Sequence, residues 1–164
     1  MASGKRSSIP QSVYLDSTVP SYHCDTRPEL ASYAETTRRW WKEESGNYDV
    51  FTSEHTLAEL GRGEYPGKEE ALGLVRAVPV LASDSEVERI AEVYMKEYVM
   101  PTGAAGDAFH LACASYHKMD YLLTWNCNHL ANANKDHHIR VTNSRLGLFT
   151  PRIVTPIQLF RERF

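Results

Sequence analysis

Short apolar runs alternate along this chain with longer stretches in which apolar residues recur at helical spacing. The first run, Val13 to Leu15, stops at Asp16 and predicts a buried strand closed by turn residues. The other strands expected are 48–52, 120–125, 153–154 and, as a strand or a connector, 78–81. The helices expected are 28–44, 54–60, 68–77, 83–98, 106–115, 132–148 and one that starts at Pro156.

Strands that alternate with helices indicate an α/β protein with a mostly parallel central sheet covered on both faces. Right-handed crossovers then bring the carboxyl ends of the strands to one edge of the sheet. A length of 164 residues suits a single domain, expected at residues 12–164 after a flexible tail at residues 1–11. A loop containing Asp25 is expected after the first strand, and Glu86 stands at capping-box spacing from Ser83 at a helix start.

Acidic side chains fall at or just beyond the predicted carboxyl ends of the strands. Asp16 follows the first strand, Glu59 lies on the helix after the second, and Asp107 lies in the first turn of a later helix. Taken singly, each has an ordinary explanation, as a turn or cap acid, an exposed helix residue, or an acid that complements a helix dipole. Together, three carboxylates that converge at one edge repel one another unless a cation neutralises them.

A hard divalent cation resolves this repulsion with oxygen ligands alone. Mg²⁺ and Mn²⁺ bind a few carboxylates and keep several waters, so this interpretation assigns no histidine or cysteine to the site. Such an ion polarises a phosphodiester and lowers the pKa of a bound water, which can then attack phosphorus. The pattern therefore favours phosphodiester hydrolysis at the edge of the sheet.

The charge distribution is compatible with a nucleic-acid partner but does not require one. The net charge is −3 overall, yet residues 118–164 contain seven Lys and Arg against three Asp and Glu. A basic part can hold a phosphate backbone, and a solvated helix face explains the same asymmetry. Three scattered cysteines favour a reducing cytoplasm over a disulfide framework or structural zinc, and no apolar run is long enough to span a membrane.

Four segments, in order along the chain, resemble the PIN-domain family and, within it, the VapC-type toxins of type II toxin–antitoxin systems. The segments are V-Y-L-D-S-T, T-L-A-E-L, G-D-A-F-H-L-A-C-A and D-Y-L-L-T-W-N-C-N-H-L-A-N. The resemblance covers nearly the whole chain from Val13. It implies a three-layer α/β/α sandwich, a Mg²⁺- or Mn²⁺-dependent endoribonuclease, an antitoxin partner that blocks the site, and a homodimer.

Carried over position by position, the resemblance implies that Asp16, Glu59 and Asp107 are the catalytic metal ligands. The fourth catalytic position is Asn126, where many members have aspartate. Asparagine offers a metal only a neutral carbonyl oxygen, so the number of metal ions stays open between one and two.

Ser17, Thr18 and Asn128 are the candidate substrate-binding residues. The two hydroxyl groups can hydrogen-bond a metal-bound water or a phosphate, or they can cap the following helix. The alternative function is a catalytically weak or inactive PIN-like module that binds RNA or a protein. A small-molecule enzyme of flavodoxin-like shape is disfavoured because residues 16–19 contain no glycine for a phosphate loop.

Overall fold

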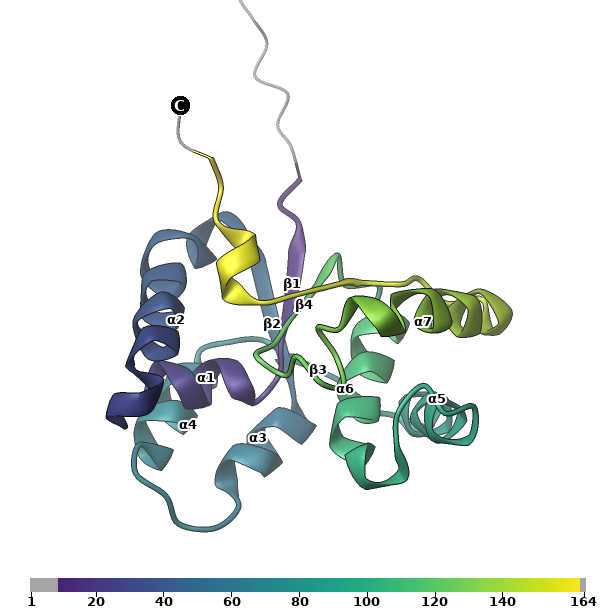
Figure 1. Cartoon of the computed structure of the whole chain (residues 1–164), viewed down its shortest axis with the longest axis horizontal. Helices are drawn as coiled ribbons and strands as arrows, with labels where there is room; N and C mark the ends of the chain where they lie inside the picture. The colour runs from purple at the N-terminus through teal and green to yellow at the C-terminus, as the bar shows by residue number, and fades with distance from the viewer. Residues whose placement is uncertain (1–8, 163–164) are drawn as a thin grey trace, which may run out of the picture.

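A five-stranded parallel sheet runs through the middle of the protein, as a computed structural model that describes residues 9–162 shows (Figure 1). The strand order is β3-β2-β1-β4-β5, and every neighbouring pair is parallel. The strands are β1 (Ser12–Leu15), β2 (Asp49–Ser53), β3 (Val80–Leu81), β4 (Tyr121–Leu123) and β5 (Arg152–Val154). Most of the predicted tail at residues 1–11 lies outside the described residues.

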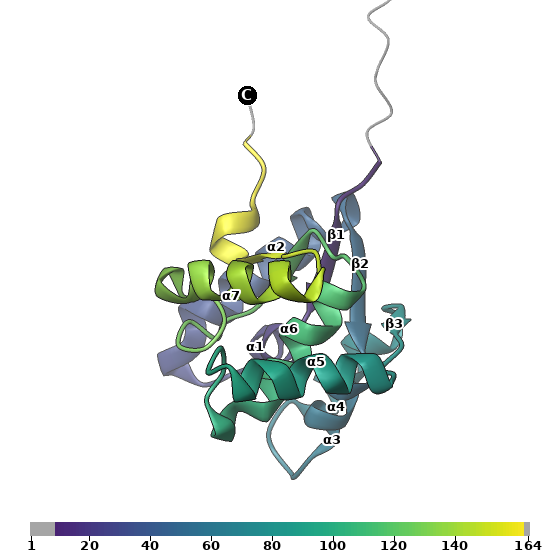
Figure 2. The same cartoon turned by 90° about the vertical axis from the view of Figure 1, so that its right-hand side faces the viewer.

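Helices cover both faces of this sheet. Figure 1 shows α1, α2 and α4 on one side and α5, α6 and α7 on the other, and Figure 2 shows α5 and α7 from the front. The α-helices are α1 (Thr18–His23), α2 (Ala31–Glu43), α3 (Glu54–Gly61), α4 (Lys68–Arg76), α5 (Ser85–Lys96), α6 (Ala105–Tyr116) and α7 (Ala133–Leu146). Short 3₁₀ turns are η1 (Pro28–Leu30), η2 (Ser45–Asn47), η3 (Thr102–Ala104) and η4 (Pro156–Leu159). None of the helices within residues 9–162 combines the length and apolar character needed to cross a membrane.

Alternation along the strands gives the sheet two buried faces. Tyr14 pairs in register with Leu122, and both side chains join the core formed with α5, α6 and α7. Val13 and Leu15 point the other way, into a second core that contains Trp40 of α2. The expected α/β/α sandwich with a parallel central sheet is therefore confirmed, because neither face of the central strand is left to solvent.

Three local expectations were wrong. The segment expected as a loop after the first strand contains α1, which Pro20 does not disrupt because the first turn of a helix needs no intrahelical N–H donor. The helix expected to reach residue 98 ends at Lys96, and Tyr98 adopts a left-handed backbone conformation with φ of 57° and is 86% exposed. The terminal helix expected from Pro156 is the single 3₁₀ turn η4.

The N-cap of α5 is Asp84 rather than the expected Ser83. Its carboxylate accepts hydrogen bonds from the backbone N–H groups of Glu86, at 3.0 Å, and Val87, at 3.2 Å. The hydroxyl of Ser83 is buried and has no hydrogen-bond partner among the described residues. The cap therefore lies one residue later than expected, and Asp84 makes the hydrogen bonds that the sequence assigned to Ser83.

We expect Asp84→Ala to lower the free energy of unfolding by about 1 kcal/mol, the usual cost of losing a helix cap. Ser83→Ala is the matched control, and it should cost nothing because no hydrogen bond is lost. Urea unfolding followed by circular dichroism measures both variants. A larger loss in Ser83→Ala than in Asp84→Ala contradicts the assignment.

Candidate active site

The site lies at the carboxyl edge of the sheet, where β1 and β4 are neighbours. The chain leaves β1 into α1 on one side of the sheet and leaves β4 toward α7 on the other (Figure 1). Adjacent strands whose connections part in opposite directions form a topological switch point, and open α/β sheets bind ligands in the crevice at such a point. Asp16 follows β1 and Thr124 follows β4, so both side chains stand at this crevice.

Asp16 forms the floor of the crevice and is only 1% exposed. Its Oδ1 accepts hydrogen bonds from the Thr18 backbone N–H, at 3.0 Å, and from the Thr18 hydroxyl, while Oδ2 accepts from the Thr124 hydroxyl. Burial raises the pKa of Asp16, although the charge of His110 and the hydroxyl donors act against that rise. These contacts from both strands hold the carboxylate in one orientation.

Glu59 approaches the crevice from α3. The N-cap of the helix is Ser53, whose hydroxyl accepts a hydrogen bond from Thr56 N at 3.2 Å. One oxygen of Glu59, Oε1, is hydrogen-bonded to His110 Nε2, and Oε2 accepts from Ser17 Oγ at 3.4 Å. Burial favours the neutral acid, but the hydrogen bond and charge of His110 outweigh it and lower the pKa of Glu59.

Asp107 enters from the first turn of α6. Its Oδ2 accepts a hydrogen bond from Asn126 Nδ2 at 3.0 Å and lies 2.9 Å from His129 Nδ1. The residue before it, Gly106, packs against Glu59: a Cβ at that position would lie 3.5 Å from Glu59 Oε2. A Cβ at this position would make ordinary van der Waals contact with α3, so the approach of α3 and α6 does not depend on glycine here.

His110 stands among the three acids and was missed by the all-oxygen interpretation. It is 1% exposed, with Nε2 on Glu59 and Nδ1 2.7 Å from the Tyr14 hydroxyl. Burial lowers its pKa, yet the hydrogen bond to Glu59 and the charges of Asp16, Glu59 and Asp107 produce a net rise in the pKa of His110. The pKa of this one imidazole therefore responds to the charges of all three carboxylates. Its position three residues after Asp107, on the same face of α6, is a sequence signal that could have revealed it.

Asn126 supports Asp107 instead of directing a free oxygen into the crevice. Its Oδ1 accepts from the backbone N–H groups of Asn128, at 3.2 Å, and His129, at 3.0 Å, and so closes the turn after β4. Its amide nitrogen donates to Asp107. The side chain of Asn128 is exposed in this turn.

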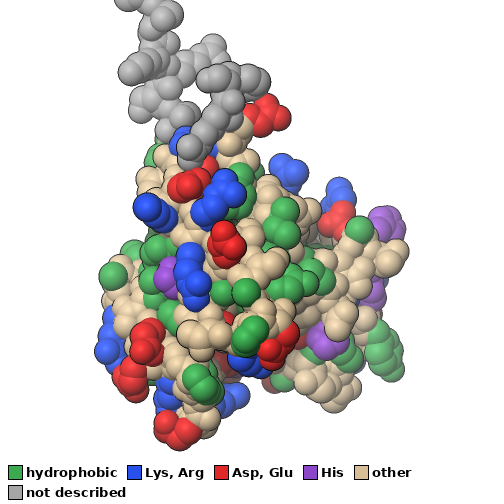
Figure 3. Space-filling view, turned by 60° about the vertical axis from the view of Figure 1, so that its left-hand side comes forward, with side chains coloured by type: hydrophobic (Ala, Val, Ile, Leu, Met, Phe, Trp, Pro, Cys, Tyr) green, Lys and Arg blue, Asp and Glu red, His purple; other side chains and the backbone are tan. Residues whose placement is uncertain are grey.

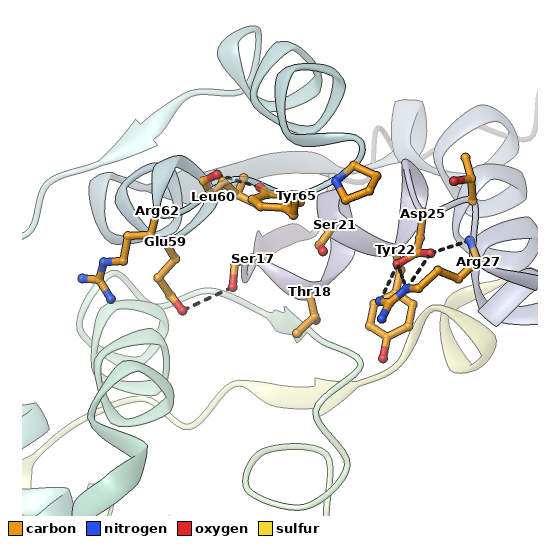
Figure 4. A pocket seen from close by; sticks show the side chains of 12 residues that line it. Ser17, Thr18, Ser21, Tyr22, Asp25, Arg27, Glu59, Leu60, Arg62 and Tyr65 are labelled. Atoms are coloured by element: carbon orange, nitrogen blue, oxygen red, sulfur yellow. Dashed lines mark hydrogen bonds and ion pairs between the residues drawn. The ribbon is translucent and has the colours of Figure 1, made fainter. Parts of the chain in front are cut away.

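The two hydroxyl residues after Asp16 have different surroundings. Thr18 Oγ1 donates to Asp16 and accepts from the backbone N–H of Trp125 at 2.8 Å, so it links β1 to the segment after β4. Ser17 faces Glu59 across a cavity of about 530 Å³ that lies between α1 and α3 (Figure 4). In the same view Arg62 lies beyond Glu59, and Arg27, paired with Asp25, stands at the opposite end.

Charged side chains outside this cavity are mixed in sign. On the side of α2 and α4 that Figure 3 brings forward, acidic and basic side chains are interspersed, with no continuous basic area on that face. A polyanion therefore gains no broad electrostatic surface there. Of the two arginines that line the cavity, Arg27 is paired with Asp25, whereas Arg62 makes no ion pair with the described residues.

Comparisons with known proteins agree on the fold. The family model described as the PIN domain matches residues 13–129. Among solved structures, that of VapBC-1 from nontypeable Haemophilus influenzae is similar, with a TM-score of 0.55 and 16% identity, covering 90% of this chain and 99% of that one. At this identity the likeness concerns the fold. A search of curated proteins finds no match.

The His110–Glu59 pair predicts a pH dependence of the metal-free protein. A raised histidine pKa stabilises the fold fully below the ordinary value of 6.5, and this stabilisation is lost as the pH rises through the folded pKa. The lowered pKa of Glu59 adds stability above its ordinary value of 4.5, which is lost as the pH falls through the folded pKa. The contribution of the pair is therefore greatest between these two values.

We expect His110→Gln to flatten the decline in the free energy of unfolding above pH 6.5, measured by urea unfolding in EDTA. His138→Gln, at an exposed position of α7, should retain the wild-type decline. An identical pH profile for His110→Gln and wild type contradicts the assignment of this histidine as the counter-charge of the acids.

Proposed function

We propose that this chain, which belongs to the PIN domain family, is a metal-dependent endoribonuclease that acts as the toxin of a toxin–antitoxin pair. The observation that supports the proposal is a chain of hydrogen bonds at the switch point of the parallel sheet, which links Asp16 through Thr124 and Asn126 to Asp107. Ser17, next to Asp16, contacts Glu59. Carboxylates gathered at such an edge bind hard divalent cations.

The residues present fit a Mg²⁺ or Mn²⁺ ion. Glu59 and Asp107 have side chains 26% and 21% exposed, so their oxygens can be reached from solvent, and Asp16 adds a fixed carboxylate below them. The charges of Asp16, Glu59 and Asp107 all act to raise the pKa of His110. We propose that these three acids hold the cation and that Asn126 orients Asp107.

When bound, the cation supplies Lewis acidity to the phosphate and lowers the pKa of a water that attacks phosphorus. The protein contributes orientation. Thr18 and Thr124 fix the Asp16 carboxylate, His110 and Ser17 fix the two oxygens of Glu59, and Asn126 fixes Asp107. Ligands held in this way need little rearrangement when the reaction begins.

We propose that single-stranded RNA lies in the cavity between α1 and α3. Arg62 is exposed and makes no ion pair with the described residues, so its guanidinium is available to a phosphate. Tyr22 lines the cavity and packs against Tyr33 and Trp125, with ring centroids 5.8 and 6.0 Å away. Aromatic rings supported in this way offer a face on which an unpaired base can stack.

The proposed toxin role is based on the structural similarity of this chain to VapBC-1, and the name VapBC-1 denotes a complex. By that likeness we propose a cognate antitoxin as the protein partner and a homodimer as the working assembly. Three cysteines without a disulfide among the described residues suit the reducing cytoplasm proposed as its location. A catalytically weak PIN-like module is the second candidate, because Asn126 leaves one carboxylate fewer than many members of the family have.

The test of the nuclease pairs Mn²⁺ calorimetry with cleavage of a fluorescent single-stranded RNA. Asp107→Asn should reduce cleavage by more than about 100-fold, beyond the effect of losing an outer partner of a metal site, and should weaken Mn²⁺ binding. Asp136→Asn, an exposed acid on α7, is the control and should retain both. Saturable Mn²⁺ binding with wild-type cleavage in both Asp107→Asn and Asp16→Ala refutes the assignment of the acids. No Mn²⁺ binding by the wild type favours the binding module.

The proposed RNA path predicts a different effect for Arg62→Ala. Removing one phosphate contact should weaken RNA binding at every sequence and lower the slope of log affinity against log salt by about 0.7. Arg145→Ala, on the exposed face of α7, is the matched control and tests whether the basic part of the chain binds RNA there. Fluorescence anisotropy in EDTA measures both variants. A smaller salt slope in Arg145→Ala alone would place the RNA on α7.

A further inference from the structure

Two histidines and one glutamate meet between α3 and α6, beside the carboxylates described above. His55 and Glu59 are one turn apart on α3, and His110 comes from α6. One potential ligand atom from each lies within 4.8 Å of the other two. We propose that His55, Glu59 and His110 form a second site, which shares Glu59 with the acidic site, for a borderline transition-metal ion, with Zn²⁺ as the representative case.

This inference goes beyond the proposed nuclease because the ligand chemistry differs. Two imidazole nitrogens suit Zn²⁺, Ni²⁺ or Cu²⁺ and are poor partners for Mg²⁺, which prefers oxygen. Two histidines and one glutamate are also a ligand set that zinc enzymes use when a fourth position stays open for water. The set therefore selects a softer ion than the acidic crevice does.

His55 offers a nitrogen that the protein itself leaves unused. Its Nε2 is buried and has no hydrogen-bond partner among the described residues, although Glu59 Oε1 is 3.3 Å away. Its ring is held by stacking on Phe109, with centroids 4.5 Å apart, and by an edge contact with His110 at 5.1 Å. A buried polar atom that points at a carboxylate but makes no hydrogen bond indicates that a ligand binds there.

His110 has the outer partner that a metal-binding histidine requires. Its Nδ1 is 2.7 Å from the Tyr14 hydroxyl, which in turn is 2.7 Å from Ser53 Oγ. Such a contact on one ring nitrogen fixes the orientation of the ring and leaves the other for the metal. Nε2 is hydrogen-bonded to Glu59. An ion that binds to Nε2 takes the place of the proton in this hydrogen bond, and the proton is released to solvent.

A second cavity gives an ion a route to these ligands. It has a volume of about 390 Å³ and is lined by His55, Glu59, Gly106 and Phe109 together with residues of α5. It reaches the cluster from the side of α5, whereas the proposed RNA path reaches Glu59 from α1. Because Glu59 belongs to both proposed sites, Zn²⁺ at the histidines competes with the nuclease cation for one carboxylate.

The test measures Zn²⁺ binding directly, by competition with a chromophoric chelator on the EDTA-treated full chain. We expect one Zn²⁺ per chain and a loss of affinity of roughly 100-fold in His55→Phe, since each ligand contributes at least as much as an outer partner. Phenylalanine keeps the stacking on Phe109, so the variant should remain folded, which circular dichroism checks. His138→Ala, at an exposed histidine, is the control and should bind as the wild type does.

A second readout separates this site from the nuclease. Co²⁺ should give visible absorption bands in the wild type and in Asp107→Asn but not in His55→Phe, whereas Mn²⁺ binding should be lost in Asp107→Asn and kept in His55→Phe. Failure of the Mn²⁺ result alone counts against the nuclease. Equal Zn²⁺ affinity in wild type and His55→Phe, or no Zn²⁺ binding by the wild type, overturns the histidine site.

Discussion

The hydrogen bond between the buried imidazole of His110 and the Glu59 carboxylate is the interaction on which the arrangement at this edge of the sheet depends. Asp16, Glu59 and Asp107 come from segments far apart in the chain and act on the same imidazole. Each carboxylate accepts at least one hydrogen bond from a neutral group, and His110 supplies positive charge between them. Without these partners, buried and partly buried carboxylates would lose their hydrogen bonds, which opposes folding.

The parallel sheet fixes the positions of the acidic residues, and the neighbouring side chains fix the orientation of their carboxylates. β1 lies at the centre with β2 and β4 beside it, so the segments that leave these three strands share one edge. Apolar packing on both faces keeps that edge rigid. Hydroxyl and amide groups then restrict the acids, which leaves a bound ion or substrate little to rearrange.

Local patterns were enough to predict much of this arrangement. The apolar runs of β1 and β4 marked these two strands, so Asp16 could be placed at a strand end from the sequence. The segment α1 was missed because six residues, Thr18–His23, are too few to show a helical period. Asp84 rather than Ser83 caps α5 because the choice depends on which backbone N–H groups are in reach.

The contacts within the site lay beyond the sequence because they join distant residues. His110 and Glu59 are separated by 51 positions, and no local spacing relates them. Asn126 is similar: its residue type suggested a neutral metal ligand, whereas its contacts with Asp107 and with the turn after β4 depend on the folded chain. The residue types indicated which chemistry was available, and the tertiary contacts determined which atoms of His110 and Asn126 form hydrogen bonds and with which partners.

The bond between Thr124 and Asp16 has a consequence for synthesis of the protein. It joins residues 108 positions apart and closes the floor of the crevice. A ribosome that has translated β1, β2 and even α6 has therefore made every acid of the pocket without the strand that orders them. The Asp16 carboxylate therefore takes its final orientation only after β4 has left the ribosome and paired with β1.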